Sequence, residues 1–197
     1  AYFVATSPAI VQLIYGNQLV FWGLIIAELA LVFGVTAAIN RLSLMSATLL
    51  FVLYSVVNGA TLSSIFFIYS VESIASVFFI TAATFAATAA FGYFTKKDLS
   101  TMGRLLFMAL IGLIIATLVN LFVKSSGLAM ILNYVGVLVF VGLTAWDTQK
   151  IKQMLLQAPD AGEAAQKVAL LGALELYLDF INLFIYLLRI MGSSSRD

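Results

Sequence analysis

Long apolar runs, separated by short polar segments, dominate the chain. Each run has about 20 residues, the length that a helix needs to cross roughly 30 Å of hydrocarbon at about 1.5 Å per residue. The six runs predict transmembrane helices over residues 19–39, 49–69, 74–94, 105–123, 128–146 and 168–190. The pattern therefore predicts an all-α integral membrane protein.

Polar and turn-forming residues fill the connections between these runs. Four connections are short, at residues 40–43, 70–73, 95–98 and 124–127. We expect a longer loop over 148–167, with a fifth helix that runs on to Lys152 as the alternative. Residues 2–18 contain Pro8, Gly16 and Asn17 and lack the basic start and the cleavage motif of a signal peptide, so we expect a loop there as well.

Basic residues indicate the orientation in the membrane. If the six helices alternate in direction, seven basic residues lie on one side and three on the other. The two sets are Arg41, Lys96, Lys97, Arg104, Lys150, Lys152 and Lys167, against Lys124, Arg189 and Arg196. The positive-inside rule places the larger set in the cytoplasm. Both Ala1 and Asp197 then lie outside, and we expect a further helix before Ala1.

The composition excludes several classes of function. Hydrophobic residues make up 63% of the 197 residues and charged residues 10%, with a mean hydropathy of +1.10. There is no Cys and no His, which excludes disulfides, Ser-His and Cys-His catalysis and the usual zinc sites. A net charge of +1, spread over short loops, predicts no nucleic-acid partner.

Small residues are dense in the segment 82–90, and Gly136 and Gly142 lie in the predicted fifth helix. In lipid, helix interfaces are enriched in small residues because these let backbones approach closely. We therefore interpret both features as helix-packing surfaces.

Four acids interrupt the apolar runs: Glu28, Asp147, Glu175 and Asp179. A charged side chain in the middle of a bilayer costs at least about 2.5–3.5 kcal/mol, so such residues face a bundle interior or a wet cavity. Glu175 and Asp179 are four residues apart and share a helix face, and Asn182 extends it. Each acid alone also has a structural interpretation: Glu28 as a hydrogen-bond partner of a neighbouring helix, Asp147 at the interface and Glu175 snorkelling.

No basic residue lies at mid-depth in the predicted runs to neutralise these acids. We therefore expect that at least one is protonated near neutral pH, or that a cation compensates them. Calcium prefers carboxylate and carbonyl oxygen, and Asn58, Asn120 and Asn182 add amide oxygens to the interior. Protons and calcium would then compete for one site.

Three segments carry a resemblance to a known family. These are Leu-Tyr-Leu-Asp-Phe-Ile-Asn-Leu-Phe at 176–184 with Leu187, Leu188 and Arg189 after it, Ile-Thr-Ala-Ala-Thr-Phe at 80–85 leading to 95–99, and Gly-Leu-Thr-Ala-Trp-Asp-Thr-Gln-Lys-Ile-Lys at 142–152. Over residues 16–192 the chain resembles the transmembrane Bax inhibitor motif family, the bacterial branch in particular.

The resemblance implies a seven-helix bundle with the last helix central, of which this chain would hold six helices and lack most of the first. It implies one transmembrane domain over residues 1–192, followed by a polar tail at 193–197. It also implies a multi-pass protein of the bacterial inner membrane.

The resemblance further implies a function. In the family a paired-aspartate site, here Asp147 and Asp179, is a pH sensor that gates a calcium leak. The site would bind protons and calcium ions, and calcium would be the transported ion. The protein would lie in membrane lipid and would hold no tightly bound cofactor. Glu28 and Arg41 correspond to an acid and a base of bacterial members, with Arg41 closing the cytoplasmic end. Glu175 departs from the small polar residue of many relatives and adds to the ion pathway beside Asn182.

Other classes of function are left open. Two transmembrane aspartates also describe intramembrane aspartic proteases, but Leu176, Tyr177 and Leu178 stand where those enzymes carry Gly-x-Gly before the aspartate, so we expect no enzyme. The main alternative is a regulatory protein that binds another membrane protein, such as a protease. A proton-coupled cation transporter is a further alternative.

Overall fold

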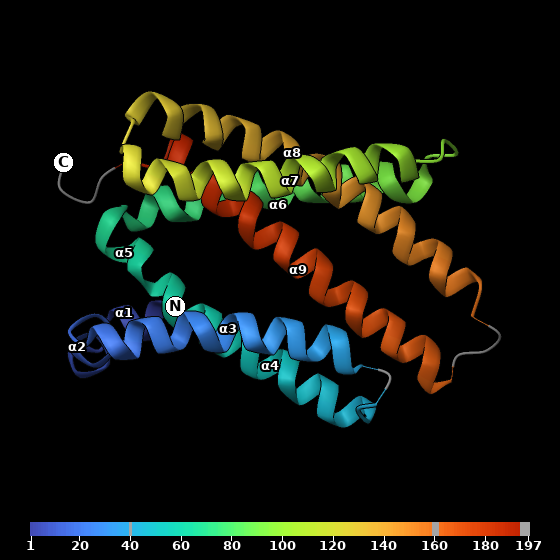
Figure 1. Ribbon diagram of the computed structural model, residues 1–197, viewed down its shortest axis with the longest axis horizontal. Helices are drawn as coiled ribbons and strands as arrows, with labels where there is room; N and C mark the ends of the chain where they lie inside the picture. The colour runs from blue at the N-terminus through green and yellow to red at the C-terminus, as the bar shows by residue number, and fades with distance from the viewer. Residues whose placement is uncertain (40, 159–161, 194–197) are drawn as a thin grey trace. The chain divides into compact units, whose positions relative to one another are not determined.

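A computed structural model describes residues 1–39, 41–158 and 162–193, and these residues form helices and connections without a strand. The elements are α1 (Tyr2–Ala5), α2 (Pro8–Tyr15), α3 (Gln18–Ala38), α4 (Leu44–Thr61), η1 (Leu62–Ser64), α5 (Ile65–Ile68), α6 (Val71–Phe94), α7 (Ser100–Val123), α8 (Ser126–Leu156) and α9 (Glu163–Met191) (Figure 1). Six segments of the described chain are long and apolar enough to cross a membrane. The predicted all-α membrane fold is confirmed.

Two sequence-based boundaries are wrong. Residues 2–18 contain two short helices, and Pro8 stands in the first turn of α2, where its missing N–H is not needed. The expected loop over 148–167 is largely helical, because α8 continues to Leu156 and α9 begins at Glu163. Lys and Gln are good helix formers, so a helix continues where hydropathy falls. With 31 residues, α8 is about 46 Å long and exceeds the hydrocarbon thickness.

Side-chain caps mark where several helices begin. Asn17 accepts a hydrogen bond from the Leu19 N–H at the start of α3, and Ser125 accepts one from the Leu128 N–H at the start of α8. These caps satisfy backbone donors that have no partner within the helix. Between α7 and α8, Lys124 adopts a left-handed conformation with φ of 54°, and the Asn120 side chain accepts a hydrogen bond from the Ser125 N–H.

The chain divides into two compact units, and α9 contributes to both. The described part of unit 1 comprises residues 1–39, 41–71, 162–171 and 193. Within it α3 packs along α4 (Figure 1). The membrane-spanning segment 44–68 is interrupted by η1, and there the Tyr15 hydroxyl lies 3.2 Å from the Ala60 carbonyl oxygen and 3.0 Å from that of Thr61.

Unit 2 comprises the described residues 72–158 and 172–192. Its core joins α7, α8 and α9 through Leu113, Leu132, Val139, Phe140, Leu143 and Leu183. The Phe180 ring of α9 also contacts Phe78 and Phe85 of α6, with ring centroids 5.5 and 5.4 Å apart. Within this unit the last helix therefore packs against α6, α7 and α8, as expected for a central helix.

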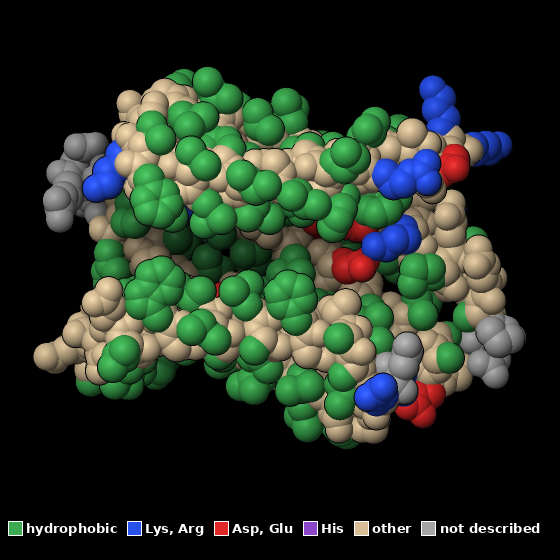
Figure 2. Space-filling model, in the orientation of Figure 1, with side chains coloured by type: hydrophobic (Ala, Val, Ile, Leu, Met, Phe, Trp, Pro, Cys, Tyr) green, Lys and Arg blue, Asp and Glu red, His purple; other side chains and the backbone are tan. Residues whose placement is uncertain are grey.

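The outward faces of the helices are apolar. Leu19, Phe33, Phe79, Phe122 and Leu138 are among the large hydrophobic side chains that are more than two-thirds exposed. Figure 2 shows a surface of largely hydrophobic side chains, on which charged groups gather in a few places. Lipid covers such faces in a membrane protein, so they need no protein partner.

Close helix contacts in unit 2 depend on glycine. A Cβ on Gly92 of α6 would lie 2.1 Å from the Ala145 carbonyl oxygen of α8, and one on Gly103 of α7 would lie 2.1 Å from the Trp146 ring. The backbone at Ala145 cannot move aside as a flexible side chain can. Gly92 and Gly103 are therefore helix-packing residues, in addition to the small residues of segment 82–90 and to Gly136 and Gly142.

We predict that Gly92→Ala lowers the free energy of unfolding by about 1–3 kcal/mol, because the added methyl group overpacks the α6–α8 contact. The matched control is Gly112→Ala on α7, where nothing lies within 4 Å of a new Cβ. That change should be neutral or stabilise by up to about 1 kcal/mol through helix propensity. Thermal unfolding of the purified variants in detergent measures both, and equal melting temperatures would contradict the close contact.

Candidate functional site

Three acids and one base meet where α8 packs on α9 in unit 2. Asp147 and Lys150 are three residues apart on α8, and Glu175 and Asp179 are four apart on α9. These spacings place each pair on one helix face. Two pairs of charged residues on facing helices therefore form one polar cluster in a largely apolar unit.

The two aspartates are the most buried members of the cluster. Asp147 is 7% exposed and Asp179 5%. Their carboxyl groups lie close enough to share a hydrogen bond when one of them carries a proton. Asp147 Oδ1 and Asp179 Oδ2 are buried and accept no hydrogen bond from any residue that the structure describes. The predicted pairing of these two residues is thus seen in the geometry.

Lys150 connects the acids of both helices. Its Nζ lies 2.9 Å from Asp147 Oδ1 and 2.8 Å from Glu175 Oε2. The Lys150 ammonium is therefore the partner of Asp147 Oδ1, whereas Asp179 Oδ2 has no hydrogen-bond partner among the described residues. No base lies at mid-depth in the predicted runs, but the sequence pattern does not indicate that Lys150, one turn after Asp147 on the continued α8, reaches the acids from the end of the predicted run.

Two neighbours on α8 position this end of the helix. The Trp146 ring lies beside Gly103, and the Lys150 ammonium lies 4.9 Å from its centroid. The buried Gln149 side chain accepts a hydrogen bond from the Leu99 N–H and donates one to the Lys97 carbonyl, each 2.8 Å long. Gln149 therefore ties the α6–α7 loop to the helix that carries Asp147. Sequence reasoning missed this role, since an amide in a helix does not by itself indicate its partner.

Glu28 belongs to a separate polar cluster in unit 1. Its carboxylate accepts a hydrogen bond from the Thr61 hydroxyl and one of 3.5 Å from the Asn58 Nδ2. Both partners lie on α4, so Glu28 bonds to a neighbouring helix, as its structural interpretation anticipated. Glu28 and the aspartate pair belong to different units.

The remaining predicted site residues have local partners. Arg41 is exposed in unit 1, and its side chain forms no ion pair within residues 1–39, 41–158 and 162–193. The Asn182 amide donates a 2.8 Å hydrogen bond to the Leu178 carbonyl of its own helix. Asn120 caps the α7–α8 turn. The predicted roles of these residues as gate, polar support and ligand stay predictions.

Asp98 lies outside the membrane-spanning segments, in the α6–α7 loop. Hydrogen bonds from the Ser100 hydroxyl and the Ser100 N–H hold the pKa of its carboxyl below the ordinary value of 3.8. Asp98 is therefore already ionised throughout the range from pH 5 to 8. It serves as a reference acid that does not titrate there.

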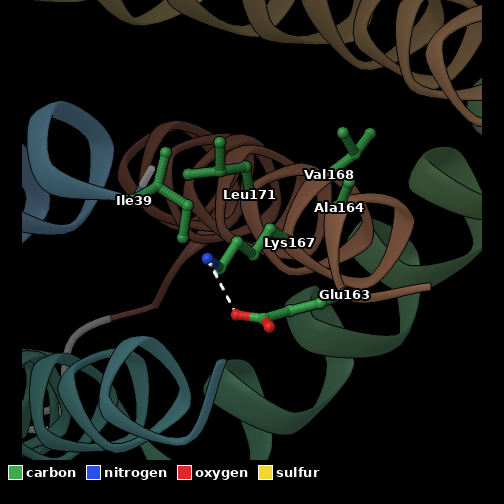
Figure 3. Close-up of a pocket in the computed structure, with 6 residues that line it drawn as sticks. All are labelled: Ile39, Glu163, Ala164, Lys167, Val168 and Leu171. Atoms are coloured by element: carbon green, nitrogen blue, oxygen red, sulfur yellow. Dashed lines mark ion pairs between the residues drawn. The ribbon is translucent and has the colours of Figure 1, made fainter. Parts of the chain in front are cut away.

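Unit 1 also contains a cavity of about 410 Å³, lined by Ile39, Glu163, Ala164, Lys167, Val168 and Leu171 (Figure 3). Its two charged side chains point toward each other and form an ion pair of 2.9 Å between Lys167 Nζ and Glu163 Oε1. The rest of its wall is apolar. The cavity therefore offers a lysine and a glutamate that already neutralise each other.

Within the described residues, no group of three or more acids is arranged to hold a metal ion. In the cluster at α8 and α9, the ammonium of Lys150 supplies the compensating positive charge. Calcium at Asp147 and Asp179 stays a prediction.

The fold and the site define a multi-pass α-helical membrane protein with a buried carboxyl pair between its last two helices. A family profile described as "Inhibitor of apoptosis-promoting Bax1" matches residues 1–196. The chain belongs to this Bax inhibitor family. The resemblance seen in the sequence is confirmed.

Relatives from several bacteria agree with this assignment. "Inner membrane protein YbhL" of Escherichia coli (strain K12) is 52% identical over 98% of the chain and 83% of its own length. A protein of Borreliella burgdorferi is 45% identical over 100% of the chain and 85% of its own length. A membrane protein of Streptococcus pyogenes serotype M1 is 39% identical over 93% and 79%. The predicted location, a multi-pass protein of the inner membrane, is confirmed.

We predict that Gln149→Leu lowers the free energy of unfolding by about 1–3 kcal/mol, because it leaves the buried Leu99 N–H without its acceptor. It should also speed hydrogen exchange at Leu99. Gln153→Leu, one turn further along α8 and exposed, is the control and should change neither quantity. Thermal unfolding and exchange mass spectrometry of the 95–99 loop measure the two effects. An unchanged hydrogen-exchange rate at Leu99 in Gln149→Leu would show that the Gln149 side chain does not protect the Leu99 N–H.

Proposed function

We propose that the protein is a pH-sensitive calcium leak pathway of the inner membrane, gated by the Asp147–Asp179 pair. The observation that supports this proposal most directly is the close approach of two buried carboxyl groups on α8 and α9. A hydrogen bond between two carboxyl groups requires that one of them carries a proton. In this proposal the contact between the two aspartates, one part of the α8–α9 interface, depends on a proton.

In the closed state the shared proton links α8 to α9. The charged groups that face the pair are Glu175 from α9 and Lys150 from α8. Loss of the proton would place two carboxylates in contact in a poorly screened interior, and like charges there repel strongly. Separation of the helices would relieve that repulsion.

A cation would be attracted to the separated carboxylates. Calcium binds carboxylate oxygen with flexible geometry. Asp179 Oδ2 has no hydrogen bond within the described residues, and Asp147 Oδ1 has the Lys150 ammonium beside it. The leak proposal assigns no chemical reaction to the pair. It makes calcium the transported ion and the proton the controlling ligand.

We predict that purified full-length protein in liposomes admits calcium in a pH-dependent way between pH 5 and 8, with flux rising as the pair loses its proton. Asp179→Asn and Asp147→Asn should flatten this dependence, because a carboxamide does not titrate. A calcium dye inside the liposomes gives the influx rate at each pH.

Asp98→Asn is the matched control, since Asp98 is an exposed acid whose carboxyl is ionised over the whole range. It should keep the pH profile of the unmodified protein. Pair variants that keep an unchanged profile would refute the gating role. Absence of calcium flux at every pH would instead favour the regulatory alternative, and saturable, proton-coupled exchange would favour a transporter.

A further inference from the structure

The Lys150 ammonium occupies the position that a cation would take between the two helices. It bridges Asp147 of α8 and Glu175 of α9 at 2.9 and 2.8 Å. Its side chain is 30% exposed, that of Asp147 10% and that of Glu175 40%, so the ion pair with Asp147 is the better shielded of the two. An ion pair between exposed side chains contributes little, whereas a shielded one influences its neighbours strongly.

The cluster has more negative than positive groups. Three carboxyl groups meet one ammonium, and Asp179 Oδ2 is buried with no hydrogen-bond donor in the described part of the chain. Even with one proton shared by the aspartates, two negative charges face one positive charge. A buried, unsatisfied acceptor beside an already bound cation indicates a site that would accept more positive charge.

We propose that Lys150 is a tethered counter-cation that occupies this site and competes with divalent cations for it. This inference rests on the proposed function and adds the group that regulates the same site. A divalent cation carries twice the charge of an ammonium and takes six to eight oxygen ligands, whereas an ammonium has three donors. Such a cation binds between α8 and α9 only after Lys150 withdraws.

The geometry allows the withdrawal. Lysine carries its charge on a flexible stem of four carbons, and the ammonium can reach water while the stem stays on an apolar surface. Here the ammonium lies beside the Trp146 ring, and α8 continues for six residues beyond Lys150, to Leu156. Lys150 is in the set of basic residues that the positive-inside rule assigns to the cytoplasmic side. The cytoplasmic interface is therefore the expected destination of its ammonium.

Trp146 provides an optical test. Terbium binds oxygen ligands as calcium does and emits when a nearby tryptophan absorbs light and transfers its energy. Terbium would be titrated at one fixed, neutral pH into full-length protein carrying Lys150→Met, which keeps the stem and removes the charge. We expect roughly tenfold tighter binding, since one like charge at this distance shifts ionic equilibria by an order of magnitude or more. Trp146→Phe should abolish the emission and so assign it to this site.

Two controls separate charge from folding. Lys150→Arg keeps the positive charge and should bind terbium as weakly as the unmodified protein. Lys152→Met removes the neighbouring lysine, whose Nζ lies 2.6 Å from the Tyr93 carbonyl and 4.5 Å from the Tyr93 ring centroid. It should leave terbium binding unchanged. Thermal unfolding of each variant shows whether it is folded.

Calcium influx into liposomes at the same pH provides the second measurement. We expect Lys150→Met to admit calcium several-fold faster than the unmodified protein and than Lys152→Met. Tighter terbium binding in Lys150→Met alone supports the competition. Equal or weaker terbium binding in Lys150→Met than in the unmodified protein overturns it. Absence of calcium flux in all proteins, with tighter terbium binding in Lys150→Met, refutes the leak pathway and keeps the tethered counter-cation.

Discussion

Compensation of buried charge is the constraint on which the architecture of unit 2 depends. Water is absent from the hydrocarbon region, so each carboxylate there must find a proton, a base or a cation. Across α8 and α9, Lys150 compensates Asp147 and Glu175, and Asp179 is left as the buried acid that needs a proton or a cation. The apolar core and the Phe180 contacts with α6 bring the helices together, but they do not select one register as firmly as ion pairs do.

Close backbone approach makes this polar contact possible. Gly92 lies against Ala145 and Gly103 against Trp146, the two residues that precede Asp147. Side chains at these glycines would hold α8 away from α6 and α7. On the following turn, Gln149 ties α8 to the 95–99 loop. Packing and hydrogen bonding thus converge on the short segment 145–150.

Much of this structure could be predicted from the sequence, and the failures have physical causes. Apolar runs of bilayer length predicted the six spanning segments of the described residues. The acids that interrupt these runs gave four candidates, from which the family resemblance selected Asp147 and Asp179 as a pair. Lys150 was assigned to a loop because hydropathy falls after Trp146, although helix propensity does not. The Gln149 contacts and the separate bonding of Glu28 to α4 join segments distant in the chain, and spacing along one helix contains no information about such partners.

The interruption of the segment 44–68 at η1 has a consequence for biogenesis. Where the helix changes, the Ala60 and Thr61 carbonyls lie within hydrogen-bond distance of the Tyr15 hydroxyl. An unsatisfied carbonyl in hydrocarbon costs several kcal/mol by order of magnitude. Synthesis proceeds from the N-terminus, so Tyr15 leaves the ribosome before the interrupted segment enters the bilayer. The Ser63 and Ser64 hydroxyls of the segment itself donate to these two carbonyls, so the segment brings two donors with it. The order of the chain adds Tyr15 as a further donor that is present before the segment arrives.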